Sequence, residues 1–241
     1  MRGLPLQTGN TNMLLQGYLP SILEGAVLTL KVAGASLMVS VVLGLVGAAF
    51  KMAPSKPLVL LAELYSTVVR GVPDLVWMLL LFFGVQMLIN EACASLGWPA
   101  PEIDSFFAGV MTIGFIFGAY MTETFRGAIM AIPKGQMEAG RAYGMGPLRV
   151  FFRITAPQMV RFALPSFSNN WLVLVKSTAL VSVIGLNDVM YRADTAKSIT
   201  QEPFTVYAVV GAIFLAITTV SDLLLKWLEK RYSLGVRESE L

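Results

Sequence analysis

The 241-residue sequence contains no histidine and only one cysteine, Cys93. The lack of histidine excludes His-ligated metal sites, His proton relays and Ser-His triads. A single cysteine excludes an internal disulfide and any metal site built from several cysteines. Charged residues are also scarce, at 14% of the chain, whereas soluble domains carry about 25%. These absences remove the commonest enzyme and metal-site classes, and no metal site is predicted.

Two further motifs are missing. The dipeptide Gly-Lys does not occur, so there is no phosphate-binding loop of the form GxxxxGK[ST]. The Gly-x-Ser-x-Gly turn of serine hydrolases is absent as well. The chain therefore cannot hydrolyse ATP by the phosphate-loop route. We predict that it is not an enzyme and holds no cofactor of its own, and that any energy for work comes from a partner or an ion gradient.

The chain is rich in apolar residues. They make up 56% of the sequence, and the mean hydropathy is +0.68. Because they gather in long runs, the sequence predicts an integral, all-α membrane protein. The net charge of +3 does not indicate nucleic-acid binding, since the basic residues lie at predicted membrane edges. No repeat is evident, so one membrane domain is expected.

Five segments are predicted to span the membrane. A Gly-x-Pro sequence at Gly71-Val72-Pro73 is expected to interrupt the second. In the fourth, a Lys near the middle costs roughly 3 kcal/mol on insertion, so Lys176 is expected to face the bundle interior. Polar loops are expected between the second and third spans and between the fourth and fifth. The segments are 20–50, 58–89, 106–131, 162–186 and 203–221.

The distribution of basic residues predicts the orientation. One side of the five spans has only Arg2, Arg192 and Lys197, which places it outside, together with the N-terminus. We divide the chain into a periplasmic N-terminal segment (1–19), a transmembrane domain (20–226) and a cytoplasmic tail (227–241). The other, cytoplasmic side has eleven basic residues: Lys51, Lys56, Lys134, Arg141, Arg149, Arg153, Arg161, Lys226, Lys230, Arg231 and Arg237.

The long polar stretch 134–165 has its own architecture. Residues 134–143 can form a short helix, which the sequence Gly-Met-Gly-Pro at 144–147 should break. A second helix is expected from Pro147 to about Ala156, ending before Pro157. A connection of this length exceeds what linking two spans requires, which indicates function. The alternative is an ordinary basic cytoplasmic loop.

The same stretch resembles the coupling loop of importer-type ABC permeases. In that family the pattern is E-A-A, three residues, G, nine residues, I, one residue, L-P. This sequence keeps the spacing but has Gly in place of the second Ala and Ala in place of the Leu. The resemblance implies a type I importer transmembrane domain, with short helices that dock on a separate ATPase subunit. The implied coupling residues are Glu138, Ala139, Gly140, Gly144, Ile154 and Pro157.

Other stretches extend the resemblance to about residues 20–233. R-G-V-P-D-L-V at 70–76 resembles the R-G-T-P-L-L-V of amino-acid permeases, and K-S-T-A-L at 176–180 resembles their K-D-[ST]-x-L. E-T-F-R-G-A and L-E-K-R-Y-S-L-G-V resemble the polar and basic amino acid family, most of all the permeases for histidine, lysine, arginine and ornithine. The implied partners are a second homologous permease, an ATPase dimer that binds ATP and Mg²⁺, a periplasmic amino acid-binding protein and membrane lipid.

Polar residues inside the spans are the candidate translocation path. A zwitterionic amino acid needs an acceptor for its ammonium and a donor for its carboxylate, and Glu123 and Lys176 suit these roles. Glu123 could instead pair with Arg126, three residues away. Lys176 could form a structural ion pair or anchor a partner subunit. The candidates are Tyr120, Glu123, Asn169, Asn170, Lys176 and Ser177.

The sequence therefore predicts the permease subunit of an ATP-driven amino acid importer in the bacterial inner membrane. It would import polar or basic amino acids that a binding protein delivers. Two other classes remain open: a gradient-driven secondary carrier and a membrane scaffold that transports nothing. A requirement for ATP and a binding protein separates the first class from the others.

Overall fold

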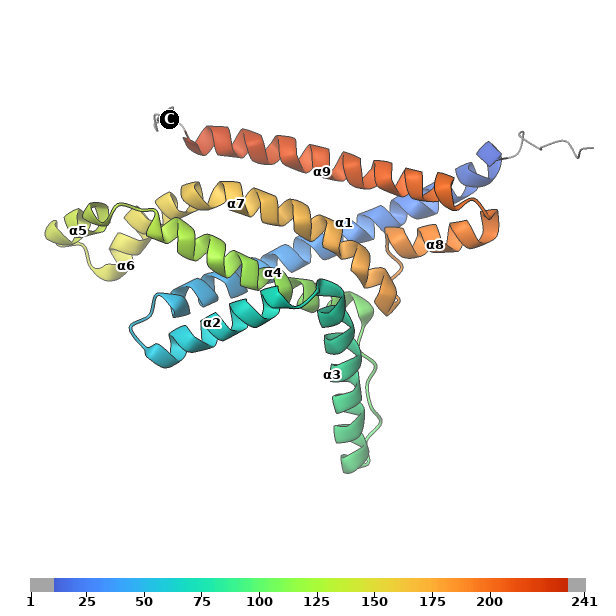
Figure 1. The fold of residues 1–241 in the computed structure, drawn as a ribbon, viewed down its shortest axis with the longest axis horizontal. Coiled ribbons are helices and arrows are strands. Elements are labelled where there is room, and N and C mark those ends of the chain that lie inside the picture. The colour runs from blue at the N-terminus through green and yellow to red at the C-terminus, as the bar shows by residue number, and fades with distance from the viewer. Residues whose placement is uncertain (1–10, 234–241) are drawn as a thin grey trace, which may run out of the picture.

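The computed structural model describes residues 11–233, and within this range the chain is helical, with no strand. Helices α1, α4, α7 and α9 run along a common direction (Figure 1). The elements are α1 (Thr11–Lys51), α2 (Lys56–Gly71), α3 (Asp74–Leu96), α4 (Ser105–Met130), α5 (Lys134–Ala142), α6 (Pro147–Val150), the π-helical η1 (Phe151–Thr155), α7 (Ala156–Ser177), the 3-10 helical η2 (Thr178–Ile184), α8 (Val189–Thr200) and α9 (Pro203–Ser233).

Five of these helical stretches are long and apolar enough to cross a membrane, as the sequence predicts. They are α1, α3, α4, the continuous stretch from α6 to η2, and α9. The first begins earlier than the predicted span, because α1 already starts at Thr11. Residues 1–10 of the predicted N-terminal segment and 234–241 of the predicted tail lie outside the described residues.

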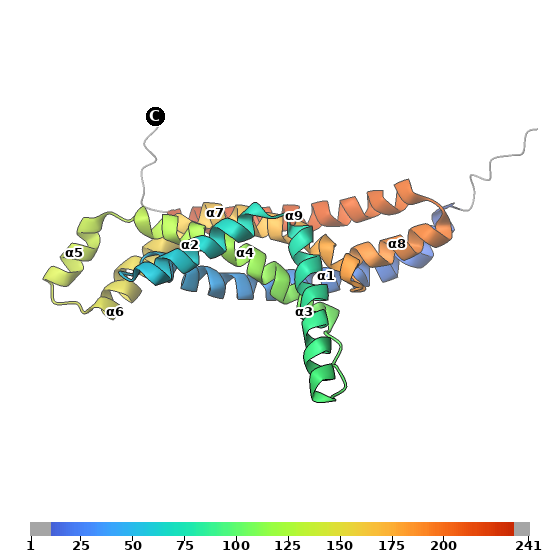
Figure 2. The same ribbon diagram turned by 60° about the horizontal axis from the view of Figure 1, so that its bottom comes forward.

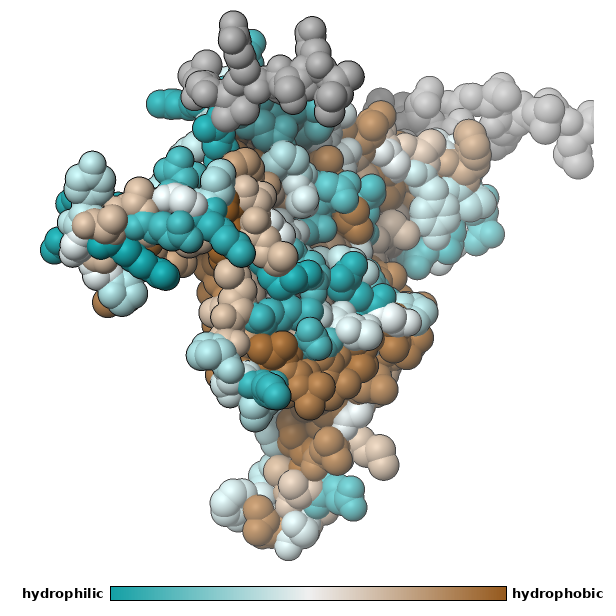
Figure 3. All heavy atoms as spheres, turned by 60° about the vertical axis from the view of Figure 1, so that its left-hand side comes forward, coloured by the Kyte–Doolittle hydropathy of each residue, from teal (hydrophilic) through white to brown (hydrophobic). Residues whose placement is uncertain are grey.

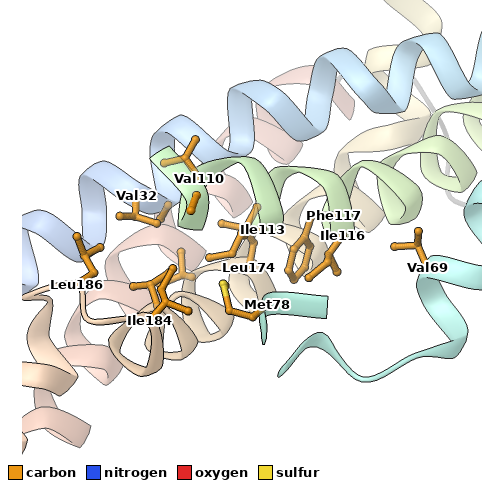
Figure 4. Packing of buried hydrophobic residues seen from close by; sticks show 14 of the residues in the cluster. Val32, Val69, Met78, Val110, Ile113, Ile116, Phe117, Leu174, Ile184 and Leu186 are labelled. Carbon is orange, nitrogen blue, oxygen red and sulfur yellow. The ribbon is translucent and has the colours of Figure 1, made fainter. Parts of the chain in front are cut away.

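Helix α4 forms the centre of the bundle. Over an apolar stretch of 18 residues in α4, 67% of the residues are buried. The corresponding stretches of α3 and α9 are each only 6% buried. Small residues allow the close approach: a Cβ on Gly114 would clash with Val39 of α1, and one on Gly118 with Leu43 and the Tyr65 hydroxyl. In the core cluster, α1 and η2 pack against α4. Figure 4 shows this for Val32, Ile113, Phe117 and Ile184.

The chain turns sharply between α2 and α3, where the sequence predicts an interruption. Val72 is extended (φ −112°, ψ 138°), and Pro73 precedes the first residue of α3. The indole N–H of Trp77 donates to the carbonyl oxygen of Val69 at 3.1 Å, so a carbonyl freed at the end of α2 is satisfied. Helix α3 then continues to Leu96, beyond the predicted end at residue 89, and stops at Gly97 with φ 71°.

Helix α3 projects away from the bundle. Both ribbon views show it pointing away from the common direction of α1, α4, α7 and α9 (Figure 2). Its surface is largely hydrophobic where it leaves the bundle and mixed at its tip (Figure 3). Lipid or another protein must therefore cover this helix. Its exposed large apolar side chains are Leu75, Val76, Leu80, Phe83, Val85, Met87, Leu88 and Leu96.

The stretch 134–165 begins as predicted but ends differently. Helix α5 ends at Ala142, Gly144 turns with φ 75°, and α6 starts at Pro147. The prediction that the second helix ends before Pro157 is wrong, because α6 continues through η1 into α7. Pro157 has no N–H and its ring crowds the preceding turn. The wider π-helical turn of η1, directly before α7, accommodates both effects.

The predicted loop 187–202 contains a helix, α8. Its first turn is capped by Asp188, whose Oδ1 accepts the N–H of Tyr191 at 3.0 Å. It packs between α1 and α9 through a second apolar cluster that includes Ile22, Ala193 and Val206. Helix α9 also exceeds its prediction, since it continues past residue 221 to Ser233, supported by the Lys226–Asp222 ion pair at 2.8 Å.

Candidate functional site

A polar pocket of about 420 Å³ lies where α2, α4 and α7 meet. Its α4 wall comes from residues three and four apart, which share one helix face, and its α7 wall from residues around Pro165. Its size falls in the range of small-molecule sites. Four of the predicted path residues meet here. The lining residues are Arg70, Tyr120, Glu123, Thr124, Pro165, Ser166, Asn169 and Asn170.

Glu123 is held by two cations. Its Oε1 accepts a short hydrogen bond from Lys51 Nζ at the end of α1, and its Oε2 accepts Arg126 Nε at 3.1 Å. The pair with Arg126 is the alternative that the sequence left open, whereas Lys51 could not be foreseen across 72 residues. The Lys51 side chain is only 9% exposed, so this cation is committed to Glu123.

The amides of the α7 wall differ from each other. Asn170 Nδ2 donates to Thr124 Oγ1 at 2.9 Å, which ties α7 to α4. The side chain of Asn169 makes no hydrogen bond to the described residues and lines the pocket. Asn169 is therefore available to a ligand as donor or acceptor.

Arg70 is a pocket residue that the sequence analysis did not select. It lies in the last turn of α2, with its guanidinium 5.4 Å from the ring centre of Tyr120. No ion pair joins it to another residue between 11 and 233. A signal was present: a charge inside a span, directly before the Gly-Val-Pro interruption, is a functional candidate.

Two predicted path residues lie elsewhere. Lys176 is exposed and lines a groove of about 320 Å³ between α7 and α9, together with Leu172, Thr218, Thr219 and Asp222. The expectation that Lys176 faces the bundle interior is therefore wrong for the single chain, because the apolar face of α7 packs against α4. Ser177 donates instead to Asp74 of α3. Glu123 and Lys176 thus do not share one pocket.

The α5–α6 elbow, residues 134–150, lies beyond one end of the bundle, opposite α8 (Figure 1). It packs closely against η1: a Cβ on Gly140 would lie 2.5 Å from Cδ1 of Ile154, so the end of the Ile154 side chain would have to move. Glu138 and Ala139 lie exposed on the same helix, and Pro157 is exposed beyond the elbow. The elbow also exposes Tyr143 (87%) and Leu148 (74%), a pattern typical of a docking surface.

The described residues include no group of three or more His, Cys, Asp or Glu side chains that could hold a metal ion. What the geometry offers is a polar pocket beside one end of an apolar bundle and, at that end, a rigid exposed elbow. This arrangement can bind a small polar solute and contact another protein.

The chain is similar to transport proteins of known family. Residues 40–234 match the family described as binding-protein-dependent transport system inner membrane component. The chain is 48% identical over 228 residues to the histidine/lysine/arginine/ornithine transport system permease protein HisQ of Escherichia coli (strain K12), covering 95% of this chain and 100% of that one. It is 38% identical to the octopine transport system permease protein OccQ of Rhizobium radiobacter, covering 92% and 93%.

The chain is also similar to solved structures of ABC transporters. A crystal structure of an amino acid ABC transporter with histidines has a TM-score of 0.76 and 33% identity, covering 90% of this chain and 96% of that one. The MetNI methionine ABC transporter, in an inward-facing conformation, has a TM-score of 0.62 at 13% identity, covering 95% and 100%. The second likeness concerns the fold alone.

Proposed function

The chain belongs to the family of binding-protein-dependent transport system inner membrane components, and from this premise we propose that it lines the path of an ATP-driven importer of polar and basic amino acids. It is a transport subunit and not an enzyme. The observation that carries the proposal is the polar pocket of about 420 Å³, built from Tyr120, Glu123, Asn169 and Asn170 inside an otherwise apolar bundle.

The substrates proposed are histidine, lysine, arginine and ornithine. The similarity to HisQ supports this set. A binding protein would deliver them on the side of α8. Lys176 and Ser177 would belong to the wider path, as residues that connect α7 to α9 and α3 and not as ligands of the substrate in this pocket.

The α5–α6 elbow would be the contact for an ATPase dimer, which binds ATP and Mg²⁺. The proposed coupling residues divide by role. Gly140 and Ile154 hold the elbow compact, and Gly144 makes its turn. The exposed Glu138 and Ala139 would face the ATPase, and Pro157 joins the elbow to α7 through η1. A rigid elbow transmits a displacement into α7, and α7 forms one wall of the pocket.

A second, homologous permease would complete the membrane unit. The largely uncovered α3 and the open side of the pocket support this, since an apolar helix projecting from the bundle gains cover from a partner as well as from lipid. The count of basic residues supports an N-terminus outside and an elbow and C-terminus in the cytoplasm. We place the chain in the bacterial inner membrane, with residues 20–226 as the transmembrane domain.

Uptake into right-side-out or reconstituted vesicles, with ATP inside and the binding protein outside, tests the proposal. The complete assembly should accumulate labelled arginine, histidine or lysine only when ATP and the binding protein are both supplied. A screen across amino acids would then define the substrate range. Accumulation driven by a proton or sodium gradient alone would identify a secondary carrier instead, and no uptake under any condition would identify a scaffold.

A further inference from the structure

The charges around the polar pocket are unbalanced. Its one carboxylate, Glu123, is already bonded to Lys51 and Arg126. Arg70 adds a third cation, at the end of α2. The pocket and its immediate surroundings therefore present three cations against one anion. A cationic side chain would be repelled here, whereas an anion would be attracted.

The end of α2 that carries Arg70 is held in place, and Arg70 stays charged. Its neighbour Val69 accepts the Trp77 indole N–H, which holds the end of α2. Trp77 in turn packs edge-on against Phe115 of α4, with ring centres 5.6 Å apart. A guanidinium does not lose its proton in proteins. Within the described residues it has only the Tyr120 ring as a partner, and its side chain is exposed, so the guanidinium is available to an anion.

A guanidinium binds a carboxylate through two parallel N–H bonds. Every α-amino acid carries such a carboxylate, whatever its side chain. The other pocket groups suit the rest of a zwitterion: the free amide of Asn169 and the hydroxyl of Ser166 can accept from an ammonium. The Tyr120 face can also attract an ammonium.

We propose that Arg70 binds the α-carboxylate of the transported amino acid, so that this pocket recognises the backbone end common to all amino acids and not a cationic side chain. This inference rests on the proposed function, because it takes an amino acid as the solute. In this proposal Glu123 balances the positive charges of Lys51 and Arg126 beside the pocket. Selection among side chains would then occur elsewhere, before the substrate reaches this pocket.

The test uses the purified, complete transporter without its binding protein, so that only the membrane site is probed. Thermal stabilisation is titrated with L-arginine, with L-argininamide, in which the carboxylate is replaced by an amide, and with agmatine, which has none. L-Arginine should stabilise the wild type at concentrations at least about tenfold lower than either analogue, as expected for loss of a charge-assisted hydrogen bond. Equal potency of the three compounds would overturn the proposal.

Variants identify the residue responsible. Arg70→Gln should raise the L-arginine concentration required by at least about tenfold and remove the preference for acid over amide. Arg70→Lys should retain part of the preference for acid over amide. Arg192→Gln, which changes an arginine on α8, is the matched control and should keep the full preference. A preference for acid over amide that survives Arg70→Gln would assign the carboxylate site to another residue. If Arg70→Gln fails to assemble, Arg70→Lys and the wild-type titrations still decide whether Arg70 binds the carboxylate.

Failure of this inference can be distinguished from failure of the proposed function. If ATP-dependent uptake persists while no compound stabilises the wild type, the pocket is not a carboxylate site, and the importer assignment stands. If uptake is independent of ATP and of the binding protein, the importer assignment fails, whatever the titrations show.

Discussion

Ser177 donates a hydrogen bond from Oγ to Oδ2 of Asp74 at 3.1 Å, and this contact joins the end of α7 to the first turn of α3. Both positions depart from the family sequences that they resemble. In R-G-T-P-L-L-V the position of Asp74 is Leu, and in K-D-[ST]-x-L the position of Ser177 is Asp. The structure shows that the two positions touch, so one carboxylate lies at this contact in either arrangement.

Exchanging the two residues tests this relationship. Asp74→Leu should destabilise the assembled protein by about 2 kcal/mol, because Ser177 loses a charged hydrogen-bond partner. Ser177→Asp should also destabilise it, since two carboxylates would then meet. The double variant, Asp74→Leu with Ser177→Asp, should recover part of both losses, measured by thermal unfolding and uptake. Losses that simply add would show that the two positions are not coupled.

The ion pairs of Glu123 lead to a second prediction. Glu123→Gln leaves Lys51 and Arg126 without their anion, so thermal stability should fall by about 3 kcal/mol. Because Glu123 is already engaged, uptake of arginine and of a neutral amino acid should fall by the same factor. A selective loss of the cationic substrate would instead make Glu123 a ligand of its side chain. Asp194→Asn, which breaks an ion pair on α8, is the control.

The elbow turn gives a third prediction. Gly144 has φ 75°, and its N–H donates to the Arg141 carbonyl at 2.9 Å; proline can adopt neither feature. Gly144→Pro should therefore separate ATP hydrolysis from uptake while the protein still inserts, lowering uptake at least about tenfold. Gly135→Ala is the matched control, since a Cβ there meets no atom within 4 Å. Coupled ATPase activity and uptake that remain normal in Gly144→Pro would refute the role of the elbow.

An exposed residue tests the same surface without disturbing its fold. Glu138→Lys reverses a charge that makes no ion pair within the described residues, so stability should stay within about 0.5 kcal/mol of the wild type. If the elbow docks on the ATPase, copurification of the ATPase and substrate-stimulated hydrolysis should both fall. An unchanged yield of the complex would exclude Glu138 from the contact.

Asp188 predicts a dependence of stability on pH. Burial raises the pKa of its carboxyl to about 6, above its usual range. The folded state therefore binds more protons than the unfolded state, and the stabilisation is lost as pH rises through about 6. Lowering pH from about 7.5 to 5.5 should stabilise the wild type by about 1 kcal/mol more than Asp188→Asn, because this range crosses only the upper part of the titration.

The asparagine variant is a close match, because its amide oxygen can still accept the N–H of Tyr191 and cap α8. Thermal unfolding of the two proteins across this pH range gives the measurement. Parallel curves would show that Asp188 does not titrate in the folded protein.

Much of the fold was predictable from the sequence, because membrane insertion depends on local composition. Apolar runs predicted the five spans. The Gly-x-Pro sequence in the second predicted span indicated its interruption, and Gly144 indicated the turn of the elbow. The extra length of α3 and the helix α8 were missed. Their sequences are polar enough to read as loops, and they are helical because of caps at Gly97 and Asp188 and, for α8, packing on α1 and α9.

The sequence by itself determined the class of protein, the number of spans and the residues that could line a path, since these follow from hydropathy and chemical type along the chain. Only the tertiary structure decided which of these residues meet. It brought Lys51 to Glu123 and Arg70 to Tyr120, and it turned Lys176 towards α9. The physical reason is that helix rotation and crossing depend on the close contacts of small residues such as Gly114 and Gly118, which relate positions that are distant in sequence.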